Sequence, residues 1–143
     1  MSTFRLSLIE SDQDYLACFE VMRELRPHLP DAATFTAQAR RQAGQGYRLL
    51  AAWQDNLVMG LVGYRVQENL LYGRFLYVDD LVAAVGVRDQ GLGGQLIEAM
   101  REEAQRQNCA HLVLDTALGN ALAQRFYFRQ GLLSKGLHFS QAL

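Results

Sequence analysis

The stretch that most limits the fold runs from residue 75 to residue 115, where the spacing of apolar residues changes from strand-like to helical and back. Residues 74–83 and 111–116 are short apolar runs typical of strands. Between them lie three glycines within four positions, followed by a helical stripe of Leu92, Leu96, Met100 and Ala104. A strand, a helix and a strand in this order predict two parallel strands joined by a right-handed crossover.

The remaining sequence adds further strands and helices around this unit. Apolar patterns predict strands over residues 4–9, 47–53 and 57–66. Helical spacing and capping residues predict helices over 12–26, from Asp31 to Gly44 or Gly46, and over 120–130 with Leu122 and Phe126 facing inward. One or two strands are expected at the end. The order β-α-α-β-β-β-α-β-α-β predicts one α/β domain over residues 1–143, with a mixed central sheet and helices on both faces.

Composition excludes several classes of function. The chain has 143 residues, of which half are apolar and a fifth charged, as in a soluble globular domain. Its net charge is −1, and the single Lys135 and the arginines are scattered, so we expect no nucleic-acid partner. The amino terminus lacks the pattern of a signal peptide and no apolar run reaches about 20 residues, so we expect a cytoplasmic protein without membrane contact.

The two cysteines, Cys18 and Cys109, lie far apart and outside any cluster with histidine. This spacing predicts neither a disulfide framework nor a metal site, and favours two buried free thiols.

The glycines before the predicted helix suggest an anion site, because main-chain amides at a helix start bind phosphates. Two nucleotide-binding motifs are excluded because residues that they require are missing. A Walker loop ending at Gly91 would continue with lysine and serine or threonine, whereas Leu92 and Gly93 follow. A dinucleotide fingerprint starting at Gly91 would place a third glycine where Leu96 stands.

The residues Arg88-Asp89-Gln90-Gly91-Leu92-Gly93 form an R-x-x-G-x-G sequence, and Asn120 to Gly131 forms an N-x-x-A-x-x-F-Y-x-x-x-G sequence. With the order of elements above, these two motifs resemble the GNAT superfamily of acyl-CoA-dependent N-acetyltransferases. The resemblance implies that acetyl-CoA is the cosubstrate and that no metal is needed.

In that resemblance the pyrophosphate of acetyl-CoA is bound by the glycine loop. Its binding residues are Arg88, Gln90, Gly91, Leu92, Gly93 and Gly94. The pantetheine arm lies between the strands at 75–83 and 111–116, where the amide of Leu81 or Val82 polarises the thioester carbonyl. Asn120 binds the pantetheine arm or caps its own helix, and these two roles are compatible.

The resemblance also implies catalytic side chains. Tyr127 matches the tyrosine that protonates the departing thiolate, with packing beside Phe126 and Phe128 as the alternative. Asp79 is favoured over Asp80 as the base, acting directly or through water, and strand alternation places the two carboxylates on opposite faces. His138 in the final strand is a further candidate base.

The amine acceptor is expected across the sheet, beside the first two helices. Candidate lining residues are Arg23, Arg26, His28, Tyr64, Tyr72 and Tyr77. Arg23 and Arg26 lie three residues apart on one helical face and suit an acceptor that carries a carboxylate. Polyamines, amino acids, aminoglycosides and peptides all remain candidates, and a homodimer is expected by resemblance only. The alternative function is a non-catalytic acyl-CoA sensor.

Overall fold

The computed structural model describes residues 4–143, so the first three residues of the expected 1–143 domain lie outside the described part. The chain forms two compact units, one that ends at Val113 and one that runs from Leu114 to Leu143. The first unit holds most of the sheet, three helices and the pockets described below. Each unit is described by itself.

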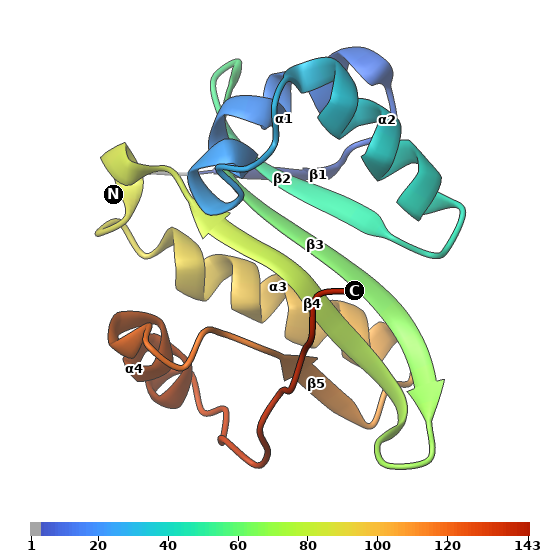
Figure 1. Ribbon diagram of the computed structural model, residues 1–143. Coiled ribbons are helices and arrows are strands. Elements are labelled where there is room, and N and C mark those ends of the chain that lie inside the picture. Colours follow the sequence, from blue (N-terminus) through green and yellow to red (C-terminus); the bar gives the residue numbers. More distant parts are fainter. Residues whose placement is uncertain (1–3) are drawn as a thin grey trace. The chain divides into compact units, whose positions relative to one another are not determined.

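The sheet has the strand order β1-β2-β3-β4-β5 (Figure 1). Its strands are β1 (Arg5–Leu8), β2 (Arg48–Gln54), β3 (Leu57–Asn69), β4 (Gly73–Ala83) and β5 (His111–Leu114). Neighbours from β1 to β4 pair antiparallel. The Ala110 N–H, just before β5, donates to the Arg74 carbonyl near the start of β4 at 2.7 Å. The two strands therefore begin at the same end and run in parallel, which confirms the predicted mixed sheet.

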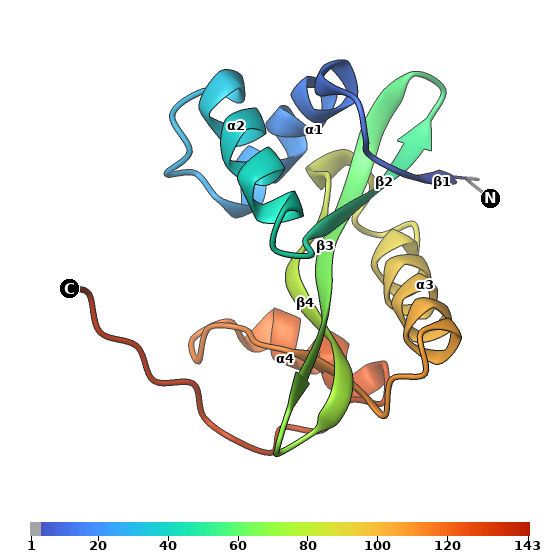
Figure 2. The ribbon, with the colours of Figure 1, turned by 90° about the vertical axis from the view of Figure 1, so that its right-hand side faces the viewer.

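Helices cover both faces of this sheet, as predicted. Figure 2 shows α1 (Asp12–Leu25) and α2 (Ala32–Ala43) on one side and α3 (Leu92–Arg106) on the other. Ser11 and Asp31 cap the first two helices, because their side-chain oxygens accept the N–H groups of Asp14 and Thr34. These caps satisfy helix amides that have no partner inside the helix.

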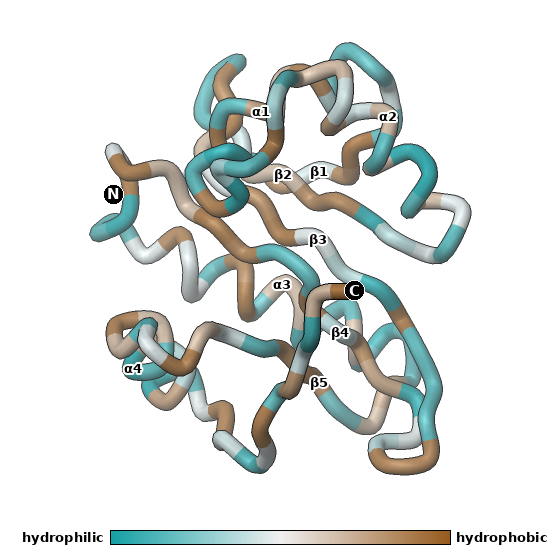
Figure 3. Tube along the Cα trace, viewed as in Figure 1, coloured by the Kyte–Doolittle hydropathy of each residue, from teal (hydrophilic) through white to brown (hydrophobic). Residues whose placement is uncertain are grey.

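The core lies between the sheet and the helices. Figure 3 shows hydrophobic stretches of β3 and β4 in the part of the sheet that the helices cover. Leu92, Leu96, Met100 and Ala104 are all buried, which confirms the apolar stripe predicted for α3. Leu16 departs from the pattern expected for the first helix, since it is 47% exposed.

The second unit confirms one predicted element and corrects two expectations. Helix α4 (Ala121–Arg129) forms within the predicted range, but Leu122 is 77% exposed and does not face inward. Residues 132–143 form no strand, so the expected final strand is wrong. A strand needs ladder hydrogen bonds to a neighbour. Within residues 4–143, the sheet contains no strand beyond β5 that supplies them.

Candidate active site

The two adjacent aspartates lie at a bulge in β4. Gly63 of β3 pairs with Asp80 and the next residue, Tyr64, pairs with Val78, so that Asp79 is an extra residue on the β4 side. A bulge interrupts the alternation of side chains and bends the strand. Both carboxylates consequently meet groups near Tyr47. The expectation that alternation puts Asp79 and Asp80 on opposite faces is wrong for this reason.

Asp80 is held through both of its carboxylate oxygens. Oδ1 accepts a hydrogen bond from Arg26 Nε at 3.0 Å and forms an ion pair with Arg26 Nη2 at 2.9 Å, and Oδ2 accepts from the Tyr47 hydroxyl at 2.8 Å. Glycine at position 63 makes room for this hydroxyl, since an added Cβ there would lie 2.0 Å from the Tyr47 oxygen. Burial and the neighbouring Asp80 carboxylate raise the pKa of Tyr47 well above its usual value, so this phenol stays protonated and donates.

Asp79 meets a different partner on the neighbouring strand. Its Oδ2 accepts from Nε of Arg65 at 3.1 Å, and the Arg65 guanidinium lies 5.8 Å from the centre of the Tyr47 ring. Burial raises the pKa of the Asp79 carboxyl above its ordinary value, and the charge of Asp80 adds to the effect, although Arg65 opposes it. The described contact uses one oxygen of Asp79, whereas Asp80 uses both.

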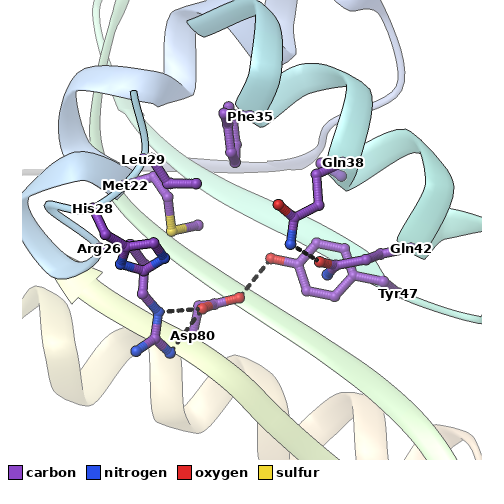
Figure 4. A pocket seen from close by; sticks show the side chains of 10 residues that line it. Met22, Arg26, His28, Leu29, Phe35, Gln38, Gln42, Tyr47 and Asp80 are labelled. Atoms are coloured by element: carbon purple, nitrogen blue, oxygen red, sulfur yellow. Dashed lines mark hydrogen bonds and ion pairs between the residues drawn. The ribbon is translucent and has the colours of Figure 1, made fainter. Parts of the chain in front are cut away.

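A pocket of about 230 Å³ opens beside Asp80 (Figure 4). Its walls come from the end of α1, from α2 and from the loop between them, and Tyr47 and Asp80 contribute from the sheet side. The lining residues are Met22, Arg26, His28, Leu29, Phe35, Gln38, Ala39, Gln42, Tyr47 and Asp80. The pocket combines an apolar wall with a carboxylate, a guanidinium, an imidazole and two amides. Such a mixture is typical of sites that orient a small polar ligand.

Two of the six predicted acceptor residues, Arg26 and His28, line this pocket. Arg23 does not share a face with Arg26, because Arg26 is the C-cap of α1, outside the helical turns, whereas the Arg23 guanidinium lies over the Phe19 ring. Tyr64 packs on the face of the sheet that α3 covers, where its hydroxyl lies 3.4 Å from the Glu103 carboxylate.

The last two predicted acceptor residues also fall outside the pocket lining. Tyr72 packs against Phe75 and His111, and Tyr77 is half-buried. Sequence reasoning missed Tyr47, Gln38 and Gln42. In the sequence these residues are marked only by their position on or just after the second predicted helix. That position does not show which face of the helix packs toward β4.

The main chain after the bulge points alternate amides outward, away from β3. The Ala84 N–H donates to the Met59 carbonyl at 2.8 Å, which fixes the phase of the ladder between β4 and β3. Alternation then directs the Val82 N–H toward β3 and the Leu81 N–H toward the opposite edge of β4. Of the two amides predicted to polarise the thioester, the geometry favours Leu81.

The glycine loop connects β4 to α3 through the short 3-10 turn η1 (Val85–Val87). Gly91 is the N-cap of α3 and has φ +76°, a left-handed conformation that glycine adopts without strain. No side chain caps this helix start. The first amides of α3, from Leu92 to Gly94, therefore face outward without acceptors within the helix, as an anion site requires.

The loop is anchored at both ends. Leu92 is buried against Gly60 of β3, where an added Cβ would lie 2.7 Å from Leu92 Cδ2. At the other end Arg88 donates to the Ala83 carbonyl at 3.0 Å and to Glu24 at 3.3 Å. In this structure Arg88 thus ties the loop to α1, while Gln90 and Gly91 are exposed.

Asn120 and Tyr127 both belong to the second unit. Asn120 Oδ1 accepts the Ala123 N–H at 3.1 Å, which confirms the capping role and leaves the side-chain NH2 group outside the cap. Tyr127 is half-buried with its ring edge-on to Phe126. Burial raises the pKa of Tyr127, so the phenol is protonated at neutral pH.

His138 does not lie in a strand, as the sequence suggested, but in the extended carboxyl-terminal segment. Its Nδ1 lies 3.4 Å from Asp115, and its side chain is 69% exposed. The imidazole of His138 is therefore surrounded largely by solvent. These contacts give His138 no feature that favours it over the aspartates.

The two cysteines differ in their burial. Both cysteines are free, but only Cys18 is buried, since Cys109 is half-buried. Among residues 4–143, no cluster of three or more His, Cys, Asp or Glu side chains is placed to hold a metal ion. None of the helices in that range combines the length and apolarity needed to span a bilayer.

Comparison with known proteins gives both sequence and structural matches. An aminoalkylphosphonate N-acetyltransferase of Salmonella typhimurium is 30% identical over 98 residues, which is 68% of this chain and 62% of that protein. The match therefore spans less than two thirds of the relative's length.

Solved structures match over nearly the whole chain. A ribosomal-protein-alanine N-acetyltransferase from Brucella melitensis has a TM-score of 0.84 at 14% identity, with 99% of both chains covered. The enzyme AAC(6')-Iy, in complex with a bisubstrate analogue, has a TM-score of 0.83 at 16% identity, again with 99% of both chains covered. At such identities the similarity establishes the fold alone.

The model of the acetyltransferase (GNAT) family matches residues 10–132, which include the R-x-x-G-x-G loop and the Asn120 to Gly131 motif. The resemblance inferred from these two motifs is thus confirmed, and the chain belongs to the acetyltransferase (GNAT) family.

Proposed function

We propose that this protein is an N-acetyltransferase that moves the acetyl group of acetyl-CoA to the amine of a small molecule. The observation that carries the proposal is the order of features along β4. The acceptor pocket and the carboxylate pair lie at the bulge, the outward Leu81 N–H follows, and the glycine loop comes next. A donor site and an acceptor site thereby meet at one strand.

The donor side fits the pyrophosphate of acetyl-CoA. The amides at the start of α3 supply hydrogen-bond donors and the positive end of the helix dipole. Gly91, Gly93 and Gly94 keep side chains out of the approach. Arg88 contributes positive charge nearby, although its present contacts hold the loop. The Asn120 amide group is the proposed contact to the pantetheine arm.

In the proposed reaction the acceptor nitrogen attacks the thioester carbonyl carbon and the carbon–sulfur bond breaks. The Leu81 N–H donates to the carbonyl oxygen, where negative charge develops. Asp79 takes the proton from the amine, directly or through water. Tyr127 gives a proton to the departing thiolate and is then reprotonated by solvent.

Asp79 is the better candidate base of the two aspartates. Arg26 and Tyr47 donate hydrogen bonds to both oxygens of Asp80, whereas Arg65 contacts one oxygen of Asp79. Asp79 has a pKa raised by burial, and a raised pKa makes a carboxylate a stronger base. The role of Asp80 is then to hold the wall of the acceptor pocket.

The acceptor is proposed to be a small amine that also carries an acidic group. Arg26 lines the pocket beside His28, so the pocket offers a positively charged partner for an acidic group. A pocket of about 230 Å³ suits a small molecule better than a folded protein surface. The relative that acts on aminoalkylphosphonates supports the same class of acceptor.

The test is a free-thiol assay with acetyl-CoA and four amines: 1-aminoethylphosphonate, alanine, ethylamine and spermidine. We expect kcat/KM for 1-aminoethylphosphonate or alanine to exceed that for ethylamine by about tenfold or more, the value of one charge-assisted contact. Turnover of spermidine alone would reject the acidic acceptor, and turnover of none of the four amines would reject the proposed class of small amine acceptor.

Three further expectations belong to the same proposal. We place the protein in the cytoplasm, assign it neither a membrane nor a nucleic-acid partner, and expect a homodimer. Light scattering coupled to size exclusion measures the mass in solution, and a mass near the 16.1 kDa of one chain would reject the dimer.

A further inference from the structure

The bulge in β4 needs support from outside the ladder. An extra residue in one strand leaves local main-chain groups unpaired and lets the strand bend. Here the extra residue is Asp79, two residues before the outward amide of Leu81 and next to Asp80, which lines the acceptor pocket. The direction of the amide and of the Asp79 carboxylate therefore depends on whatever fixes the bulge.

Arg26 contacts both residues of the bulge. Its Nη2 donates to the main-chain oxygen of Asp79 at 2.8 Å, and its Nε donates to the carboxylate of Asp80 at 3.0 Å. Arg26 is itself fixed, since its main-chain N–H donates to the Met22 carbonyl at the end of α1. A planar guanidinium makes such paired contacts with little further loss of freedom. Figure 4 shows Arg26 reaching Asp80 from this helix end.

The side chains of Tyr47 and Arg65 contact only the carboxylates of the two aspartates. Tyr47 donates to Asp80, and Arg65 donates to Asp79. Arg26 is the member of this network that also binds the main chain of the bulge. It joins the end of α1, which lines the acceptor pocket, to the strand that carries the proposed oxyanion donor.

We infer that Arg26 is a positioning residue for acetyl transfer, which clamps the β4 bulge and so directs the Leu81 N–H and the Asp79 carboxylate toward the reacting groups. The inference rests on the proposed function. Because catalytic groups displaced by about 1 Å can lose about 100-fold in rate, we expect loss of the clamp to lower kcat by about 10- to 100-fold.

The clamp also predicts a change in pH dependence. The charged and titratable groups around Asp79 are Asp80 on the same strand, Arg65 on β3, Arg26 at the end of α1 and Tyr47 before β2. Arg26 lowers the pKa of Asp79, so its loss raises that pKa further. The acidic limb of the kcat/KM profile should then move to higher pH, which loss of stability alone would not cause.

The variants are Arg26→Gln and Arg26→Lys, with Arg40→Gln as the matched control. Like Arg26, Arg40 donates to one carboxylate, that of Asp12, and to one main-chain oxygen, that of Glu10. These contacts are exposed at the surface and include no residue of β4. Acetyl-CoA affinity by calorimetry, kcat with the best amine and the kcat/KM pH profile are measured for each. Amide hydrogen exchange at Asp79, Asp80 and Leu81 is measured by NMR without substrate.

We expect Arg26→Gln to lower kcat and speed exchange at residues 79–81 while acetyl-CoA affinity stays within about twofold, since the glycine loop is untouched. Arg26→Lys should recover part of the pH profile but not the exchange protection. Unchanged exchange in Arg26→Gln overturns the clamp even if no amine is acetylated. Unchanged kcat in an active protein overturns the positioning role and leaves the acetyltransferase assignment standing.

Discussion

The substitution Gly63→Ala tests whether close packing against Tyr47 or the strand propensity of the residue decides stability at position 63. Replacing a strand glycine with alanine normally stabilises a protein by about 0.5–1 kcal/mol. At position 63, however, the added Cβ would lie 2.0 Å from the Tyr47 hydroxyl and 2.5 Å from Cζ of that ring. Tyr47 is only 2% exposed, so its ring has little space to retreat.

The magnitude follows from two losses. Overpacking a core costs about 1–3 kcal/mol, and moving the Tyr47 hydroxyl away from the Asp80 carboxylate forfeits a hydrogen bond to a charged group of about 1.5–3 kcal/mol. After subtracting the propensity gain, we expect the free energy of unfolding to fall by about 1.5–5.5 kcal/mol. Urea unfolding followed by fluorescence measures this difference.

Two further variants make the prediction specific. Gly60→Ala in the same strand should cost about 1 kcal/mol, because its Cβ meets the end of the Leu92 side chain, which can shift. In a Tyr47→Ala background Gly63→Ala should become neutral or stabilising, which gives a coupling energy of about 1.5 kcal/mol or more. A Gly63→Ala protein as stable as the wild type, or an equal loss without the Tyr47 ring, would refute the packing argument.

Three other predictions address the donor site and the thiols. Gly91→Asp places a negative charge at the start of α3 and a side chain at φ +76°, so acetyl-CoA affinity by calorimetry should fall about tenfold or more, and more than for Gly91→Asn. Tyr127→Phe removes the proposed thiolate acid and should lower kcat by about 100-fold at unchanged acetyl-CoA affinity; unchanged kcat would reject that role. Burial raises the pKa of Cys18 to about 12, so a thiol reagent at pH 8 should label Cys109 first and Cys18 only on unfolding, and rapid labelling of both would contradict the packing around α1.

The fold was largely readable from local patterns. Side-chain period, the caps at Ser11 and Asp31 and the glycine cluster located the helices and strands of the first unit. The final strand was predicted wrongly because an apolar pattern alone does not show whether a neighbouring strand is present to accept its main-chain hydrogen bonds. Leu122 was misjudged because nine residues of helix leave the choice of inward face to tertiary contacts.

The site was likewise predictable where the local backbone decides the residue, and unpredictable where distant parts of the chain meet. The glycine loop was predictable because its backbone conformation demands glycine at position 91. The shared surroundings of Asp79 and Asp80 were not, since a bulge comes from the pairing of two strands and leaves no mark in one of them. Tyr47 and Arg65 reach the aspartates from elsewhere in the sequence, and only the folded chain brings these groups together.

Stoichiometric product analysis tests whether acetyl transfer to a small amine occurs at β4. Purified protein is incubated with acetyl-CoA and 1-aminoethylphosphonate or alanine, and free thiol and N-acetylated product are quantified together. We expect one thiol released for each amine acetylated, and loss of both products in Asp79→Asn. Binding of acetyl-CoA with no acetylated product from any amine class would contradict this expectation and would favour an acyl-CoA sensor.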